Sequence, residues 1–170
     1  VLKGLQALFN QDGGTGRVTR LNAGGLPNAR VHLNGWLSQL VPSMREMIVP
    51  DTTPGRPSMG GTDDASFACH GVPAFGMGGA SWDYGVVTWH TTRDTYDKVV
   101  LEDLKHNATL VATLAYLASE DPSFITRERV DLNTLPAMGR PGVPAAAGAQ
   151  APRTWPTCTP VPRVTKPRLK

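Results

Sequence analysis

Short runs with the pattern of a buried β-strand alternate along this 170-residue chain with segments of helical pattern. Residues 5–12, 17–22 and 72–77 are apolar or alternating runs that end at polar residues or at glycine, as strands do. Residues 28–40 and 101–119 carry apolar side chains at spacings of three and four, as amphipathic helices do. This alternation predicts an α/β fold, in which helices pack in layers against a sheet.

The sequence also predicts where the helices begin and end, and which face each one buries. Asn28 is placed to cap the first helix, and Pro42 is placed to end it or kink it. Thr62 or Asp63 can cap a short helix that ends at Gly71. The apolar positions expected to face the core are Ala29, Leu33, Trp36, Leu37 and Leu40 in the first helix, and Leu101, Leu104, Ala108, Val111, Ala115 and Ala118 in the last.

Hydropathy and charge argue against two classes of protein. No apolar run approaches the ~20 residues that a membrane helix needs, so no membrane span is expected. The net charge of +3 comes from residues 135–170, which hold six Lys or Arg residues and no acidic residue. The rest of the chain is mildly acidic and lacks the basic surface that nucleic-acid binding requires.

Prolines set the last part of the chain apart from the rest. The last 36 residues contain eight prolines and little periodicity, so we expect a domain over residues 1–120 and a Pro-rich basic tail over residues 121–170. This tail is either disordered or an extended strap over the domain, an option that Trp155 and Cys158 keep open. The two cysteines, Cys69 and Cys158, are either free thiols or one disulfide, and their spacing does not fit a thiolate zinc site.

Asp12 stands where an apolar strand run ends and the glycine-rich loop GGTG begins. In open α/β sheets, ligands bind beyond the carboxyl ends of the strands. A carboxylate there can hold a metal ion, and glycines let a substrate approach the backbone closely. The alternative interpretation is that Asp12 only makes a turn with its own loop.

His90, in the run VVTWHTTRDTYDKV, is the histidine best placed for metal binding. A metal-bound imidazole needs a carboxylate or a carbonyl on its second ring nitrogen, and Asp94 and Asp97 lie close in sequence. The alternative is a histidine that is simply hydrogen-bonded in a loop. The other histidines lie within or at the end of helical patterns, where surface, packing or helix-end roles are expected: His32, His70 and His106.

The run GGTDDASF places two adjacent acidic residues at the start of a short helix. Asp63 is expected to cap that helix, and a functional interpretation would have Asp63 or Asp64 line a site. Together with Asp12 and His90, this turn makes an incomplete metal constellation, because a catalytic zinc ion takes three protein ligands.

Three motifs, in this order, resemble those of one known family. LFNQDGGTG, GGTDDASFACHGVPAFGM and WHTTRDTYDKV are similar to the C-terminal half of the co-catalytic dizinc aminopeptidases. That family includes bacterial leucyl aminopeptidases, aminopeptidase Y and glutamate carboxypeptidase II. The resemblance covers about residues 1–120 and implies a doubly wound mixed sheet flanked by helices, with two zinc ions at the carboxyl end of the sheet.

The resemblance also implies roles for single residues. Asp12 looks like the aspartate that closes one zinc site, and His90 looks like the last histidine ligand, on the other zinc ion. Asp94 and Asp63 would support these ligands. Trp89 stands where the family often has Tyr, and its indole N–H can donate to the developing oxyanion. The other ligands and the general-base glutamate lie upstream in the family, so we expect the fold to be incomplete at the N-terminus.

Some residues depart from the family pattern and leave alternatives open. Asp64 stands where the family often has a histidine. Glutaminyl cyclases, a related branch, resemble this chain at W-H-T and at D-D, whereas DYG and DTYDKV look more like the peptidases. A metal-free relative that kept the fold and serves as a receptor or scaffold is a third possibility.

The expected function is that of the C-terminal part of a zinc-dependent exopeptidase, of aminopeptidase or carboxypeptidase type. Such an enzyme hydrolyses peptide bonds with a metal-activated water. Asp83 and Tyr84 lie in GGASWDYGVVT, which is expected to form a loop, and they are candidates for the wall of a substrate pocket. We expect peptides as the partner, a secreted or periplasmic location, and no activity from the 170-residue chain alone.

Overall fold

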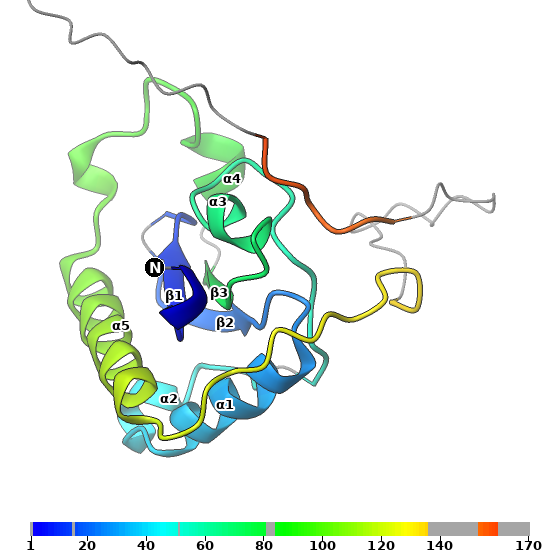
Figure 1. Cartoon of the computed structure of the whole chain (residues 1–170). Coiled ribbons are helices and arrows are strands. Elements are labelled where there is room, and N and C mark those ends of the chain that lie inside the picture. Colours follow the sequence, from blue (N-terminus) through cyan, green and yellow to red (C-terminus); the bar gives the residue numbers. More distant parts are fainter. Residues whose placement is uncertain (1, 15, 51, 81–83, 136–152, 160–170) are drawn as a thin grey trace, which may run out of the picture.

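The structure is a computed structural model that describes residues 2–14, 16–50, 52–80, 84–135 and 153–159. Figure 1 shows a small central sheet with helices around it. In chain order the elements are η1 (Leu2–Gly4), β1 (Leu8–Gln11), β2 (Val18–Asn22), α1 (Pro27–Ser38), α2 (Pro42–Arg45), α3 (Ala65–Ala68), β3 (Ala74–Gly79), α4 (Tyr84–Val87), η2 (Tyr96–Lys98) and α5 (Leu101–Glu120).

The sheet has three strands in the order β1-β3-β2. β1 runs parallel to β3, and β2 runs antiparallel to it. The predicted α/β fold, with a mixed sheet and flanking helices, is therefore confirmed. None of the helices in the described residues has the length and apolar character that crossing a membrane would require.

The two faces of the sheet differ in character because alternate strand residues point to opposite sides. Phe75 and Met77 of the central strand are buried in the hydrophobic core. Gly76, between them, pairs with Asn10 of β1 and with Asn22 of β2, which makes a row of small and polar residues on the other face. One face thus builds the core and the other is left polar.

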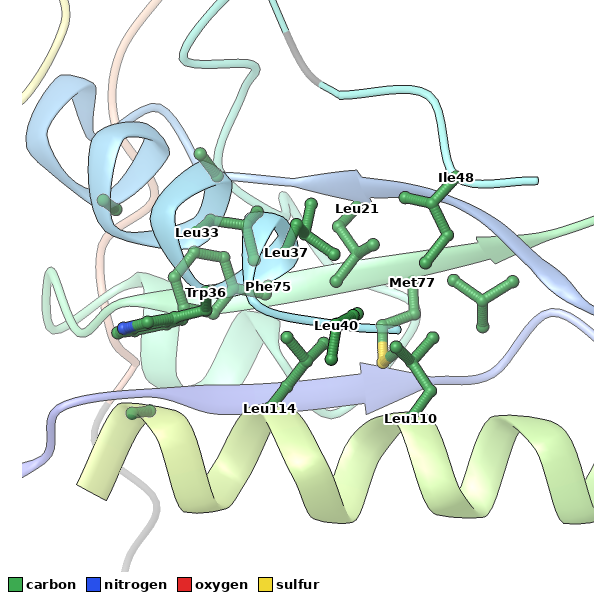
Figure 2. Close-up of a cluster of buried hydrophobic side chains, with 14 of the residues drawn as sticks. Leu21, Leu33, Trp36, Leu37, Leu40, Ile48, Phe75, Met77, Leu110 and Leu114 are labelled. Atoms are coloured by element: carbon green, nitrogen blue, oxygen red, sulfur yellow. The ribbon is translucent and has the colours of Figure 1, made fainter. Parts of the chain in front are cut away.

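Helices α1 and α5 cover the apolar face. Figure 2 shows side chains of both helices gathered with those of the sheet in one cluster. In α1 the predicted buried face is confirmed. Burial of this continuous cluster is the main source of stability for a domain of this size. The labelled members are Leu21, Leu33, Trp36, Leu37, Leu40, Ile48, Phe75, Met77, Leu110 and Leu114.

The predicted cap of α1 is wrong. The helix begins at Pro27, and the capping position is Leu26, whose side chain makes no capping hydrogen bond. Proline suits the first turn because its missing N–H would have had no partner there. Asn28 lies inside the helix, and its Oδ1 atom accepts a hydrogen bond from the Thr126 backbone N–H at 2.7 Å. The amide therefore ties the chain after α5 back to α1.

The predicted last helix is confirmed, but the face it buries differs from the predicted one. The buried residues of α5 are Asn107, Leu110, Leu114 and Ala118. Leu101 and Leu104 are 56% and 52% exposed. Apolar residues in this helix define two overlapping stripes. The stripe that packs inward includes one polar residue, Asn107. Its side-chain amide can be buried because it hydrogen-bonds to backbone groups.

Two short helices also depart from expectation. The structure forms α4 over Tyr84–Val87, within a stretch that we expected to be a loop. Helix α3 ends at Ala68, before the predicted end at Gly71, and Gly71 closes the turn that follows in the left-handed region at φ 70°. The residue at the capping position is Asp64 rather than Thr62 or Asp63, and its side chain makes no capping hydrogen bond.

Residues 153–159 are attached to the domain by a covalent bond and by packing. Cys69, directly after α3, forms a disulfide with Cys158, which decides between the two alternatives for the cysteines. The indole of Trp155 packs against the core and donates to the Val130 carbonyl oxygen at 3.0 Å. The guanidinium of Arg129 lies 4.8 Å from the centre of the same indole. We call residues 153–159 the strap.

Candidate active site

A cavity of about 1160 Å³ lies at the polar face of the sheet. Asp12, the residue directly after β1, and His90, after α4, both line it, as does Trp89. The two residues that were predicted from the sequence as metal ligands therefore line the same cavity. The other polar or charged residues in its wall include Asn10, Arg20, Asn22, Asp64 and Tyr84.

Glycines in β3 leave room for this cavity. Gly76 and Gly78 both line it. A Cβ atom on Gly76 would lie 3.4 Å from Oδ2 of Asp64, and a Cβ on Gly78 would lie 3.2 Å from the guanidinium of Arg20. Side chains on this face of the central strand would therefore occupy the space that the neighbouring polar groups now use.

The loop after Asp12 is held in place from two sides. Gly14 has φ 82°, and a Cβ atom there would lie 2.8 Å from the ring of Tyr84, so glycine suits the backbone and permits the close contact. From the other side, buried Asn107 of α5 donates to the Gly16 carbonyl oxygen and accepts from the Val18 N–H, both at 3.0 Å. The long helix thus fixes the loop through backbone groups.

The backbone at His90 is left-handed, with φ 58°. Among the described residues it is the only one other than glycine with a positive φ. Histidine visits this region more readily than most residues, and such conformations concentrate at functional sites. The indole of Trp89 stacks on the His90 imidazole with a centroid distance of 4.1 Å. Thr91, which follows, donates from Oγ1 to the Thr88 carbonyl oxygen at 2.7 Å and so closes the turn.

Tyr84 connects the two loops. Its ring packs against Gly14, and its hydroxyl donates to Oδ2 of Asp94 at 3.0 Å. This hydrogen bond is the main reason why the pKa of Tyr84 lies above 10.0, and partial burial and the negative charges of Asp94 and Asp12 act in the same direction. The hydrogen bond that the structure shows for Asp94 is therefore the one from Tyr84. Tyr84 begins α4, and the chain reaches His90 shortly after this helix.

The two acidic residues before α3 have different surroundings. Asp63 is exposed and does not line the cavity. Asp64 is only 6% exposed and lines it. No hydrogen-bond partner for Oδ1 of Asp64 exists within the described part of the chain. Asp83, the other expected pocket residue beside Tyr84, lies outside the described residues.

The residues present fit a metal site in part. A carboxylate oxygen and an imidazole nitrogen are both ligands that zinc takes, and Asp12 and His90 offer them on one cavity wall. In the described ranges, the one group of three such donor residues within 4.8 Å of each other is Cys69, His70 and Cys158. The two sulfur atoms of that group are bonded to each other, so it is not a zinc site in this form.

Several residues at the site were missed by the sequence reasoning. Asn107 interrupts an apolar stripe, and a polar residue at such a position signals a buried hydrogen-bond role. Asn10 lies within a strand run and donates from its amide to Oγ1 of Thr62 at 2.7 Å, which ties β1 to the turn before α3. Its signal was weak, because an asparagine at the end of a strand is ordinary.

Comparison with known proteins agrees with this geometry. The family model described as Peptidase family M28 matches residues 2–115. Neither the curated proteins nor the solved structures that were compared with the chain gave a significant match. The matched span contains all three motifs and includes Asp12 and His90. The chain therefore belongs to peptidase family M28, a family of zinc-dependent peptidases.

Proposed function

We propose that this chain provides Asp12 and His90 to a two-zinc centre that removes residues from the ends of peptides. The observation that supports the proposal is that these two residues, 78 positions apart in the sequence, line one cavity beyond the end of β1. Ligand sites of open α/β sheets lie at this position. Zinc, when bound, polarises the substrate carbonyl and makes a water molecule acidic enough to attack it near neutral pH.

The residues of this chain would divide the work as follows. The Asp12 carboxylate and the His90 imidazole would hold the centre, each as a ligand of one zinc ion. Trp89 is 53% exposed, so its indole is accessible to a substrate. The indole stacks on the His90 imidazole, so the turn that positions His90 would also position Trp89. Its N–H would donate to the oxyanion that forms when the carbonyl is attacked.

The outer residues would hold these groups in place. The ring of Tyr84 packs on the loop after Asp12, and its hydroxyl donates a hydrogen bond to Asp94 in the loop after His90. Tyr84 would therefore resist a shift of either loop. Asp63 would act only through the turn before α3, since its side chain lies outside the cavity wall. Tyr84 would form part of the pocket wall next to the substrate.

The chain alone would not be active under this proposal. It offers one ligand to each zinc ion, and tight binding needs three or four ligands in fixed positions. The remaining ligands and the general base would come from sequence outside this chain, as the family resemblance implies. Purified as given, the 170-residue chain should hold no stoichiometric zinc and show no turnover.

The test compares two histidines in the complete protein. His90→Ala should abolish zinc occupancy, measured by elemental analysis. It should also lower the rate of aminoacyl-anilide hydrolysis by more than about 100-fold, which is the largest loss expected for a residue that only hydrogen-bonds to a metal ligand. His106→Ala, on α5 and outside the cavity wall, should change neither. Equal losses from both variants would contradict the proposal. Cyclisation of an N-terminal glutaminyl peptide without hydrolysis would instead identify a cyclase.

A further inference from the structure

Asp64 carries a buried carboxylate that the proposed mechanism does not use. The residue is 6% exposed, and its side chain does not cap α3 although it stands at the capping position. Oδ1 is buried and has no hydrogen-bond partner among the described residues. A buried carboxylate oxygen without a partner is unfavourable, and such a group in a folded protein calls for a partner beyond the described residues.

The position of Asp64 makes it reachable from the active-site cavity. It lines that cavity and also a second one of about 710 Å³. Gly76, on which a Cβ atom would lie 3.4 Å from Oδ2 of Asp64, is likewise shared by both cavities. The carboxylate therefore stands beside the central strand where the two spaces adjoin, and because only Oδ1 is buried, a ligand in the first cavity can approach Oδ2.

The charged residues that line the two cavities indicate which charge a ligand of Asp64 should carry. Arg20 lines the first cavity, and Arg56 and Arg153 line the second, yet none of the three donates to Oδ1 of Asp64. Of the two acidic residues that the described part of the chain contributes to the first wall, Asp12 is assigned to the metal centre, and Asp64 is the one available to face the substrate. A positively charged donor is thus the group that this position favours.

We propose that Asp64 is a specificity-determining residue that binds an ammonium group of the peptide substrate. This inference rests on the proposed peptidase function for the class of ligand and adds the chemical group that is recognised. An ammonium group fits better than a guanidinium, because a guanidinium pairs best with both carboxylate oxygens, and Oδ1 is buried. The ammonium is that of the peptide N-terminus or that of a lysine side chain.

Binding of small amides to the 170-residue chain tests the inference without turnover. Three probes of similar size are compared by calorimetry: norleucinamide has the α-ammonium, N-acetyllysinamide has only the ε-ammonium, and N-acetylnorleucinamide has neither. One ammonium probe should bind about tenfold or more tighter than the neutral one, as expected for a charge-assisted hydrogen bond. Which of the two does so identifies the source of the ammonium.

The variants are Asp64→Asn and Glu120→Gln. Asp64→Asn keeps the shape and removes the charge, so the advantage of the ammonium probe should fall to about onefold. Glu120→Gln removes one exposed negative charge at the end of α5, outside both cavity walls, and the advantage should persist. An advantage that survives in Asp64→Asn, or that is absent from the wild type, would overturn the inference.

A second measurement does not depend on a variant folding. In the wild-type chain, the ammonium probe should shift the backbone amide resonances of Ala68 and Gly76, and the neutral probe should not. Shifts elsewhere only would count against Asp64. If the complete zinc-loaded protein fails to hydrolyse any peptide while these binding results hold, the proposed function fails and the ammonium site stands.

Discussion

Tyr84 is the residue through which the two sides of the site are coupled. Its ring touches the loop after Asp12, its hydroxyl bonds Asp94, and it begins the helix that leads to His90. A hydroxyl that donates to a carboxylate holds its proton more tightly than a free phenol. The titration of this one group therefore reports whether the two loops are joined.

We predict that Asp94→Asn lowers the pKa of Tyr84 in the folded chain. The folded-state pKa is raised above 10.0 mainly by the bond to Asp94. The contact therefore stabilises the fold below about pH 10 and is lost as the pH rises through the raised pKa. Phenolate absorbance against pH measures this, with Tyr84→Phe identifying the component. An unchanged curve in Asp94→Asn would contradict the assignment.

At the scale of elements, α5 both completes the core and fixes the site. Leu110 and Leu114 enter the cluster shared with α1 and the sheet (Figure 2). Asn107, on the same stripe, holds the loop after Asp12. The packing of the core and the position of the loop after Asp12 therefore both depend on the rotation of α5 about its axis. A change in that rotation would move the loop.

The rotational setting of α5 can be tested with two leucines. Leu114→Ala should lower the free energy of unfolding by about 2–5 kcal/mol, because Leu114 is fully buried. Leu104→Ala is the matched control, and it should cost less than about 1 kcal/mol, since that side chain is 52% exposed. Urea unfolding of both variants gives the two values. The reverse order would support the stripe predicted from sequence.

Periodicity predicted most elements because local spacing determines which face of a helix or strand can be apolar. The same information could not choose between two stripes in α5, since Leu101 and Leu104 are as apolar as Leu110 and Leu114. That choice depends on Asn107 finding backbone partners distant in the sequence. The shared cavity of Asp12 and His90 could be expected from motifs, and their role as metal ligands stays a prediction. The buried state of Asp64, in contrast, depends on a cavity that forms only when β3 and α3 meet.

At the scale of the whole molecule, the strap joins the end of the described chain to the middle of the domain. The disulfide links Cys69 to Cys158 across a sequence separation of 89. Arg153 of the strap lines the second cavity together with Asp64. Trp155 adds apolar contact with the core. The strap therefore contributes to stability and also to the wall beside the proposed ammonium site.

Loss of the disulfide should lower stability without abolishing the fold. Cys158→Ser should reduce the free energy of unfolding by about 2–5 kcal/mol, because a long loop is no longer closed in the unfolded chain. Thermal unfolding with and without a reductant measures the effect. Reductant should lower the wild type to the level of the variant and leave the variant unchanged. A wild type that does not respond to reductant would show that the bond does not form.

The same disulfide changes what a protease can do to this molecule. A single cut of the backbone anywhere between Cys69 and Cys158 yields two fragments that stay covalently joined. A cut between residues 70 and 89 would place Asp12 and His90 on different fragments and still keep both in one particle. Such nicked protein would run as one species on a gel without reductant and as two species with it. Cleavage and loss of the assembled site are therefore separate events in this protein.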